Sequence, residues 1–547
     1  MNRKEFAEFL IGKTEHTREE YEAMYPERNL KEGEMVTRFA PSPTGFVHIG
    51  SLFVSFLDTK FAKQTNGISY LRVEDTDTKR TVENGVSNII RDLDNFGIIF
   101  DEGMTSDTEE KGSYGPYLQS ARRDIYRAYA KDLIEKDLAY PCFLSEEEMA
   151  DIRSMQEDIK ARIGIYGKYA KYRNMSIDDA VEKINNGEKY IIRLKSPGNF
   201  DNKIIFEDVI RGRLEFNEND LDIVIIKSDG LPTYHFAHAI DDHLMHTTHV
   251  IRGDEWVSSI PVHVQLFQVL GFKAPKYLHI SPLMKKDNGS VRKLSKRKDA
   301  EAAVSYYHEE GIPTYAVLLY IMTIANSNFE AWLDANPNGK IEDFDLTFDK
   351  MSASGSLFDM DKLLNISKNY ISRLTKDKVY DMAISYAKEY DSVLYDLLVK
   401  YEDYSRNVFN IEREGVKPRK DLAKFSDIRN YLWYMYDELY NPSNYEFMNV
   451  TDKDEISKIL STYMEKYYNV DDKDTWFNNI KLLASELGYA SNMKEYKANP
   501  DSFKGNVADI ATVLRVALTS KSQTPDLYEI MKLFGKDRVL NRYKKFM

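Results

Sequence analysis

The chain has 547 residues, which at about 150 residues per domain predicts three to four domains. With 42% hydrophobic and 30% charged residues it is globular and not disordered, and its net charge of −13 argues against non-specific coating of nucleic acid. The longest apolar run, over 315–325, is too short to span a membrane, and the single Cys142 excludes a disulfide framework. The charged first thirty residues lack an apolar signal core, so we expect a cytoplasmic protein.

The first clear fold signal is a strand, helix, strand unit near the N-terminus. A strand is predicted over 35–40, a Pro/Gly-rich loop over 41–50, a helix over 52–64 with Ser51 as N-cap, and a second strand over 68–73. This order is typical of a βαβ crossover and predicts a parallel sheet. Ligands of such sheets bind at the carboxyl ends of the strands, where the loop lies.

The parallel-sheet pattern is interrupted and later resumes. An apolar strand over 221–226 and a helix over 260–270 continue it, so residues 122–215 are predicted to be an insertion into one nucleotide-binding fold. The tail is different, because only four of the 26 glycines fall in residues 371–547 and its apolar residues recur at helical spacing. We therefore expect a helical C-terminal region.

Two segments carry residues that suit a nucleotide. The loop over 41–50 leads into a helix N-terminus, which attracts phosphate, and His48 adds a donor beside it. About 245 residues later, the lysines between Lys293 and Arg297 can neutralise a pyrophosphate leaving group. Each segment alone also fits an ordinary turn or a solvated charged loop. Together, on either side of one interrupted parallel fold, they indicate ATP chemistry.

These two segments resemble the signatures of the class I aminoacyl-tRNA synthetases. His48-Ile49-Gly50-Ser51 is similar to their HIGH motif, with Ser51 in place of the second histidine, and Lys293 to Arg297 is similar to their KMSKS motif. Further blocks narrow the resemblance to the bacterial glutamyl-tRNA synthetases and extend it over about residues 35–542. These blocks are residues 37–45, 72–77, 115–120, 227–235, 249–256, 514–519 and 524–529.

The resemblance implies an α/β fold with several domains. A Rossmann-like nucleotide-binding domain carries an inserted acceptor-binding domain and is followed by α-helical stem-contact and anticodon-binding domains. The implied boundaries are 1–35 for an N-terminal helical extension of unassigned role, 36–121 and 216–285 for the two halves of the Rossmann catalytic domain, 122–215 for the inserted connective domain, 286–370 for the lysine-loop and stem-contact domain, and 371–547 for the helical anticodon-binding domain.

The resemblance also implies the activity of a glutamate–tRNA ligase. Such an enzyme activates L-glutamate with ATP, accompanied by Mg²⁺, to glutamyl-adenylate and pyrophosphate. It then transfers glutamate to the 3′-terminal adenosine of tRNA(Glu), and members of this subfamily generally need bound tRNA for the first step. The sequence leaves open whether tRNA(Gln) is charged as well. Relatives are mostly monomers, so a monomer that binds no membrane is expected.

The charges of glutamate guide the choice of its ligands. Two arginines and one carboxylate complement its two carboxylates and one ammonium group. By the resemblance, the glutamate site consists of Arg38 with Tyr234 for the side-chain carboxylate, Arg252 for the α-carboxylate, Glu74 for the ammonium group, and Ala40 and Ser42 in the pocket lining.

The ATP site follows from the same resemblance. Its expected residues are Thr44, His48, Gly50, Glu255, Lys293 and Lys296. His48, Lys293 and Lys296 are the expected catalytic contacts, with Lys296 the first choice for pyrophosphate. No side chain has to act as a nucleophile, because the substrate carboxylate attacks the α-phosphorus. Catalysis then consists of positioning and charge stabilisation.

Three segments have a second interpretation. His235 and His238 fit a metal site by spacing, but they fall in a block that builds the pocket wall in the family. Cys142 stands where some relatives carry the first ligand of a zinc knuckle, and because its companion cysteines are absent we expect no zinc and no metal site. The aromatic run over 431–436 could stack on anticodon bases, although helical spacing favours core packing.

Other functions compete with this interpretation. A glutaminyl-tRNA synthetase shares the nucleotide fold but typically carries a β-barrel anticodon region, unlike this glycine-poor tail. A tRNA-modifying glutamyl transferase would be far shorter. A plain RNA-binding or regulatory module would not need the intact His48, Lys293, Lys296 and Glu74.

Overall fold

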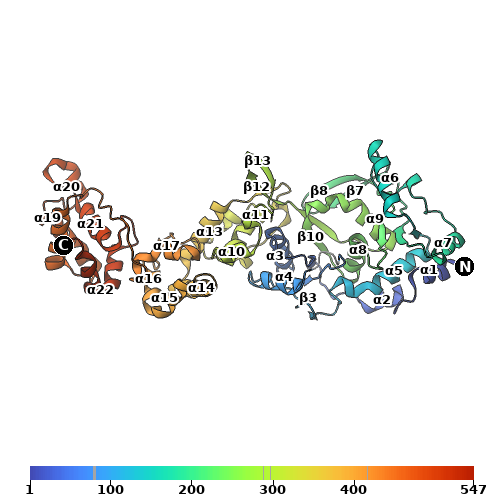
Figure 1. Cartoon of the computed structure of the whole chain (residues 1–547), viewed down its shortest axis with the longest axis horizontal. Helices are drawn as coiled ribbons and strands as arrows, with labels where there is room; N and C mark the ends of the chain where they lie inside the picture. Colours follow the sequence, from blue (N-terminus) through green and yellow to red (C-terminus); the bar gives the residue numbers. More distant parts are fainter. Residues whose placement is uncertain (78–81, 288, 296, 416) are drawn as a thin grey trace. The chain divides into compact units, whose positions relative to one another are not determined.

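The computed structural model describes residues 1–77, 82–287, 289–295, 297–415 and 417–547. The chain forms two compact units: residues 1–306 with 318–359, and residues 307–317 with 360–547 (Figure 1). In the part of the chain that the structure describes, every helix is too short or too polar to cross a membrane.

The strands, in chain order, are β1 (Val36–Phe39), β2 (Ile68–Leu71), β3 (Glu102–Met104), β4 (Glu110–Lys111), β5 (Ala139–Cys142), β6 (Ile191–Leu194), β7 (Lys203–Asp208), β8 (Gly212–Asn217), β9 (Val224–Ile226), β10 (His249–Gly253), β11 (Lys276–Ile280), β12 (Leu283–Asp287), β13 (Ser290–Lys293) and β14 (Ser356–Leu357). The helices of the first unit are α1 (Arg3–Ile11), α2 (Arg18–Met24), α3 (Ile49–Gln64), α4 (Gly85–Asp94), α5 (Arg123–Glu135), α6 (Glu146–Asp158), α7 (Ile177–Asn185), α8 (Tyr234–Leu244), α9 (Ile260–Leu270), α10 (Ser305–Glu309), which runs on into the second unit, and α12 (Phe329–Ala335).

The predicted βαβ unit is confirmed. β1 pairs with β2 in parallel, with Val36 opposite Ile68, and β2 pairs in parallel with β3. The crossover helix α3 packs against β1 and β2 through buried side chains such as Leu52 and Leu57. The carboxyl ends of these strands therefore meet the loop that precedes α3.

The predicted start of this helix is wrong. α3 begins at Ile49, its N-cap is His48 and not Ser51, and the His48 Nδ1 atom accepts the Gly50 N–H at 2.9 Å. Serine is the more common N-cap, which is why the sequence favoured it. An imidazole nitrogen can accept the same hydrogen bond, so His48 caps the helix while it lies in the loop over 41–50.

The second parallel pair of this unit is β10 with β11, where Arg252 lies opposite His279. β10 runs beside β1, since the Thr248 N–H donates to the Val36 carbonyl at 3.0 Å. α8 and α9 lie side by side along the same part of the unit (Figure 1). Both predicted arginine ligands thus come from neighbouring strands.

The strand predicted over 221–226 forms β9 but does not resume the parallel sheet, so that expectation is wrong. β9 pairs antiparallel with β6, and β6 pairs antiparallel with β5. A short apolar run reads the same in either pairing direction, so the sequence could not decide this point. A separate antiparallel hairpin, β7 with β8, precedes it.

The N-terminal segment folds onto the first unit. Buried side chains of α1 and α2, including Phe6 and Tyr21, cover α5. The Tyr25 hydroxyl donates to the Gly115 carbonyl at 2.7 Å and accepts from Arg122 Nη1 at 3.2 Å. The extension is therefore part of this unit's core.

The second unit is helical, as predicted for the tail. Its core is formed by side chains from α13 (Met360–Arg373), α14 (Lys376–Tyr390), α15 (Ser392–Lys400), α16 (Glu402–Asn410), α17 (Ile428–Leu432), α18 (Lys453–Thr462), α19 (Lys473–Glu486), α21 (Val507–Thr519) and α22 (Leu527–Tyr543). Every residue of α20 (Met493–Ala498) is at least partly exposed. In the aromatic run, Tyr434 and Tyr436 are buried in this core, whereas Tyr431 is exposed. Core packing therefore accounts for most of that run.

Candidate active site

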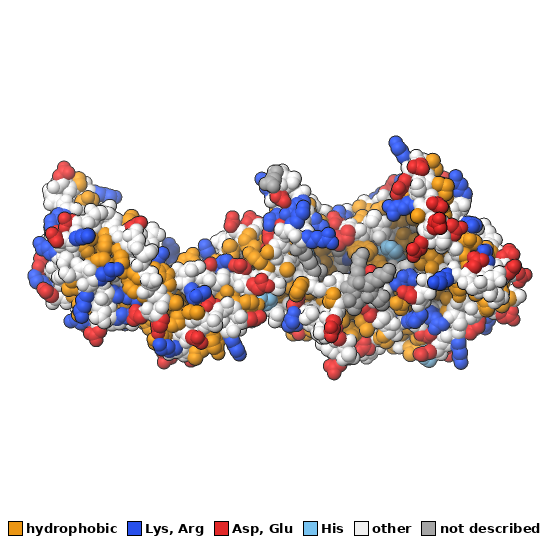
Figure 2. Space-filling model, in the orientation of Figure 1, with side chains coloured by type: hydrophobic (Ala, Val, Ile, Leu, Met, Phe, Trp, Pro, Cys, Tyr) orange, Lys and Arg blue, Asp and Glu red, His pale blue; other side chains and the backbone are white. Residues whose placement is uncertain are grey.

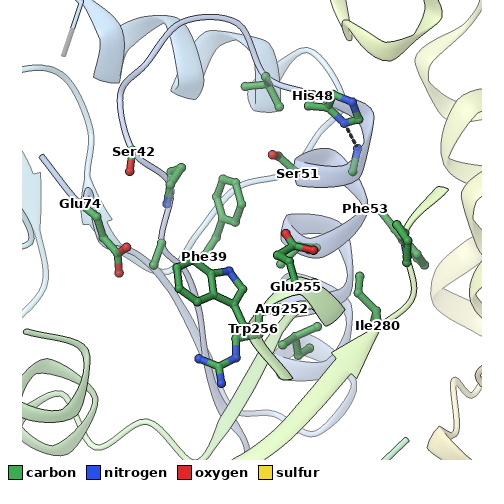
Figure 3. Close-up of a pocket in the computed structure, with 18 of the residues that line it drawn as sticks. Phe39, Ser42, His48, Ser51, Phe53, Glu74, Arg252, Glu255, Trp256 and Ile280 are labelled. Carbon is green, nitrogen blue, oxygen red and sulfur yellow. Dashed lines mark hydrogen bonds between the residues drawn. The ribbon is translucent and has the colours of Figure 1, made fainter. Parts of the chain in front are cut away.

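One pocket of about 440 Å³ collects the predicted site residues. It lies at the carboxyl ends of β1 and β10 and is shown in Figure 3, where His48 and Ser51 lie at one end and Glu74 and Arg252 at the other. Its lining includes every predicted glutamate and ATP residue except Lys296, which lies outside the described residues: Arg38, Ala40, Ser42, Thr44, His48, Gly50, Glu74, Tyr234, Arg252, Glu255 and Lys293.

The His48 end of the pocket is shaped by the turn before α3. Gly45 has φ +122°, a conformation that only glycine adopts without strain. A Cβ atom on Gly50 would come 3.1 Å from the His48 ring. Because His48 Nδ1 accepts the Gly50 N–H, a neutral His48 ring carries its proton on Nε2. The turn therefore offers backbone and side-chain donors to an anion.

Arg252, on β10, is buried with one donor left over. Its Nε donates to His279 Nε2 at 2.9 Å, and its Nη2 faces His263 Nδ1 at 3.2 Å. Its Nη1 is buried and has no hydrogen-bond partner among the residues that the structure describes. An unpaired buried donor on a cation is costly, and a substrate carboxylate would satisfy it. This geometry suits the predicted contact with an α-carboxylate.

Arg38, on β1, is held by an acid in α8. Its Nε lies 3.4 Å from both carboxylate oxygens of Asp242. Asp242 also receives Arg72 Nη1 at 2.6 Å and His238 Nδ1 at 2.9 Å. Although burial opposes ionisation, Arg38 and Arg72 hold the pKa of Asp242 well below its usual range. Asp242 is thus the shared counter-ion of two buried arginines.

Glu74 follows β2 and faces the same pocket. Arg72 Nη2 donates to its Oε1 at 3.2 Å. Burial nevertheless raises the pKa of Glu74 to about 7, against the opposing effect of Arg72 and Arg38. A bound ammonium group would favour the ionised carboxylate, so this group is poised to bind a cation.

Aromatic side chains close this end of the pocket. The rings of Tyr234 and Trp256 lie 4.3 Å apart, centre to centre, and the Arg252 guanidinium lies 4.6 Å from the centre of the Tyr277 ring. Trp256 had no predicted role, although it ends the block over 249–256. The sequence signal that could have identified Trp256 was a large aromatic residue close to Arg252 in the chain.

The lysine end of the pocket is a basic surface. Lys293 Nζ lies 3.3 Å from Glu255 Oε2, and both side chains are about half exposed, at 56% and 52%. Lys286, Lys293, Arg297 and Lys298 are exposed around the β12–β13 hairpin, and Figure 2 shows lysine and arginine side chains gathered there. This cluster faces the pocket through Lys293.

An acid beneath the lysine loop fixes its path. Asp299 is buried and accepts both Arg292 Nη1 at 2.7 Å and Nη2 at 2.8 Å, and its Oδ2 accepts the Ser295 N–H at 2.9 Å. Hydrogen bonds from Arg292 hold the pKa of Asp299 below its usual range. Asp299 therefore anchors Arg292 and Ser295, which lie on either side of Lys293 in the chain.

The two histidines of the metal interpretation have separate partners. His235 Nδ1 lies 2.8 Å from His263 Nε2, while His238 Nε2 lies 2.8 Å from the Tyr277 hydroxyl. Within the described ranges no group of three or more His, Cys, Asp or Glu side chains is placed to hold a metal ion. Cys142 is buried in β5, and the absence of zinc there stays a prediction.

Comparison with known proteins decides the family. The model of the tRNA synthetases class I (E and Q), catalytic domain, matches residues 34–365. The chain belongs to this family. A second model, of an anticodon binding domain, matches residues 393–547 of the synthetase.

Curated relatives and a solved structure agree with that assignment. The synthetase is 50% identical over 551 residues to a glutamate–tRNA ligase of Clostridium perfringens, with 100% of each chain covered. It is 48% identical to the corresponding ligase of Clostridium beijerinckii, again over 100% of each chain. A crystal structure of a glutamate tRNA ligase from Elizabethkingia meningosepticum, in complex with its amino acid, matches with a TM-score of 0.74 and 25% identity, covering 94% of this chain and 99% of that one.

Proposed function

We infer that this synthetase is a glutamate–tRNA ligase. It activates L-glutamate with ATP to glutamyl-adenylate, releases pyrophosphate, and transfers glutamate to the 3′-terminal adenosine of tRNA(Glu). The full-length identity to curated ligases of that name supports this assignment. The structural observation that carries it is one pocket in which two buried arginines and one carboxylate lie opposite a phosphate-binding turn.

The charges of this pocket match glutamate group by group. Arg252 offers its unpaired Nη1 to the α-carboxylate, and Arg38 with Tyr234 receives the side-chain carboxylate. Glu74, with a pKa of about 7, receives the ammonium group. Glutamine carries no charge on its side chain, so it would leave Arg38 without a second anion. These contacts favour glutamate as the amino acid.

Activation needs positioning and charge stabilisation. An oxygen of the glutamate α-carboxylate attacks the α-phosphorus of ATP, and the bond from that phosphorus to the pyrophosphate oxygen breaks. The His48 turn holds the phosphates, and Lys293 with Lys296 neutralises the charge that accumulates on pyrophosphate. The Lys293 ammonium exchanges its contact with Glu255 for phosphate in this step.

Transfer and metal use complete the proposal. The 2′-hydroxyl oxygen of the terminal adenosine attacks the carbonyl carbon of the adenylate. The bond from that carbon to the phosphate oxygen breaks, AMP leaves, and the hydroxyl proton passes to solvent. Mg²⁺ enters with ATP, held mainly by phosphate oxygens and water, as is usual for this ion, and Glu255 is the carboxylate at that end of the pocket.

We further propose that the synthetase acts as a monomer in the cytosol, where tRNA is charged for translation.

ATP–pyrophosphate exchange tests the activation step. Exchange should require glutamate, should not proceed with glutamine, and should depend on added tRNA. Lys296→Ala should lower the exchange rate by roughly 100-fold or more, the scale for removing one preorganised donor. Lys273→Ala, at an exposed lysine in the loop after α9, is the matched control and should leave the rate unchanged. An unchanged rate in Lys296→Ala would reject that residue's role.

Aminoacylation with two purified tRNAs tests the second step. Charging of tRNA(Glu) is required by the proposal, and the same assay with tRNA(Gln) shows whether the enzyme also charges that tRNA. Affinity for tRNA should fall steeply with salt, because phosphate contacts release counterions. Metal analysis of the purified protein checks for zinc, and light scattering checks the monomer.

A further inference from the structure

The orientation of Arg252 depends on the state of one histidine. Its Nε–H donates to His279 Nε2, so this nitrogen must present a lone pair. A His279 ring with a proton on Nε2 would place one N–H against another and push the guanidinium away. Whatever fixes the proton of His279 on Nδ1 therefore also fixes Arg252.

That proton is fixed by an acid at the end of β7. Asp208 Oδ2 lies 2.6 Å from His279 Nδ1, and both side chains are fully buried. An ionised carboxylate can only accept, so His279 must carry its proton on Nδ1. Burial lowers the pKa of His279, which keeps the ring neutral. Burial works against ionisation of Asp208, but hydrogen bonds from His279 and Arg211 outweigh it and lower the pKa of this acid.

Asp208 is itself locked in place by its own turn. Its Oδ1 accepts the N–H groups of Ile210 at 3.1 Å and Arg211 at 2.9 Å. Both carboxylate oxygens are therefore engaged by donors, one by the turn and one by the imidazole. An amide in this place could not accept on both sides.

The hairpin tip is joined to the catalytic strands at this point. The Val209 N–H donates to the Tyr277 carbonyl at 3.0 Å, and Arg211 donates to the His279 carbonyl at 3.2 Å and to Asp254 Oδ2 at 3.1 Å. The alternate side chains of β7 differ in exposure: Ile205 is 54% exposed, whereas the Phe206 ring lies 5.7 Å, centre to centre, from the Tyr277 ring. The contact with β11 thus includes Phe206 and the tip that carries Asp208.

We propose that Asp208, from the segment between the two halves of the nucleotide-binding fold, is a positioning residue for the glutamate site. It selects the His279 tautomer that accepts from Arg252 and so aims Arg252 at the α-carboxylate. The proposal rests on the proposed function, in which Arg252 binds that group. It predicts that Asp208 influences the use of glutamate without touching it.

Steady-state aminoacylation of Asp208→Asn tests this role. The KM for glutamate should rise roughly ten-fold or more, the scale for losing one hydrogen bond that orients a charged group, while the KM for ATP stays within about two-fold. Glu207→Gln, at the exposed neighbour on the same strand, is the matched control and should behave as wild type. An unchanged KM for glutamate in folded Asp208→Asn would overturn the proposal.

A double-mutant cycle separates this role from general damage. In a His279→Ala background, Asp208→Asn should have no further effect on the KM for glutamate, because the two residues act in series. If the two substitutions instead raise the KM for glutamate by the product of their separate effects, Asp208 acts by another route and the proposal is rejected.

Two further variants decide the matter if Asp208→Asn fails to fold. His279→Gln supplies an oxygen acceptor without a tautomer and should keep the KM for glutamate within about three-fold, whereas His279→Ala should raise it. Equal KM values for glutamate in both variants would contradict the proposal that Asp208 acts on Arg252 through His279. Loss of all glutamate-dependent activity in the wild type would instead reject the proposed function.

Discussion

Oδ1 of Asp242 lies 2.6 Å from Nη1 of Arg72, and both side chains are fully buried. The same carboxylate contacts Arg38 on β1, so one acid on α8 links β1 to the residue that follows β2. Removing one partner from a buried ion pair leaves the other uncompensated, which costs about 3–5 kcal/mol.

Asp242→Asn should therefore lower the free energy of unfolding of the first unit by about 3–5 kcal/mol. Chemical denaturation followed by fluorescence measures this change. Glu157→Gln removes an acid from an exposed pair with Arg153 on α6, and should cost less than about 1 kcal/mol. Equal decreases in the free energy of unfolding in the two variants would show that Asp242 stabilises the fold no more than an exposed acid does.

Asp58, on α3, gives a stability prediction of the opposite sign. Both of its carboxylate oxygens are buried and have no hydrogen-bond partner in the described part of the chain. Burial raises the pKa of Asp58 well above its usual value, with Arg38 opposing and Asp242 adding to the shift. The stability contributed by a raised folded-state pKa is complete below the unfolded pKa of about 4 and is lost as pH rises through the folded pKa.

Asp58→Asn removes this ionisation. The variant should gain stability relative to wild type as pH rises, by about 1.4 kcal/mol for each pH unit between the unfolded and folded pKa values. Denaturation at pH 5 and pH 7 measures the difference. Asp151→Asn, at an exposed acid on α6, should show no such trend. A constant difference between Asp58→Asn and wild type would mean that Asp58 is ionised in the folded protein.

Glu74 predicts the pH dependence of glutamate binding. Its pKa of about 7 means that the free enzyme loses this carboxylate as pH falls through neutrality, and the ammonium group then loses its partner. The Kd for glutamate should rise roughly ten-fold between pH 8 and pH 6, as calorimetry can measure. The Kd for ATP serves as the control, and Glu74→Gln should bind glutamate weakly at both pH values. A flat profile in the wild type would place the ammonium elsewhere.

Arg38 tests the recognition of the side-chain carboxylate. Arg38→Lys keeps the positive charge but loses the planar fork and the contact with Asp242, so the KM for glutamate should rise roughly 10- to 100-fold. Aminoacylation kinetics measure it, with Arg91→Lys on the exposed face of α4 as control. If Arg38→Lys retains the wild-type KM, the fork does not bind glutamate.

The sequence could identify the groups that face substrate, because each lies in a motif with a defined chemistry. Arg38, Glu74, His48 and Arg252 all line the pocket as that reasoning requires. Asp242 was within reach of the same reasoning, since it lies one helical turn after His238 in α8, on the face that meets the pocket.

The groups that orient these residues were beyond sequence reasoning. Asp208 and His279 are 71 residues apart, and nothing in the chain order indicates that a hairpin tip meets the end of β11. The prediction that β9 resumes the parallel sheet was wrong for a related reason, because its antiparallel partner β6 lies in the segment that interrupts the nucleotide-binding fold. Local sequence patterns indicate helices and strands, whereas contacts between segments far apart in the chain become visible only in the folded structure.

The N-terminal extension bears on how this protein can be shortened. Tyr25 accepts from Arg122, and Arg122 in turn donates to Asp241 at 2.7 Å, beside the acid that holds Arg38. Removing residues 1–34 would expose the face of α5 that α1 and α2 cover. It would also remove the Tyr25 hydroxyl that accepts a hydrogen bond from Arg122. Affinity tags are therefore better fused before Met1, which is 54% exposed, than used to replace the first helices.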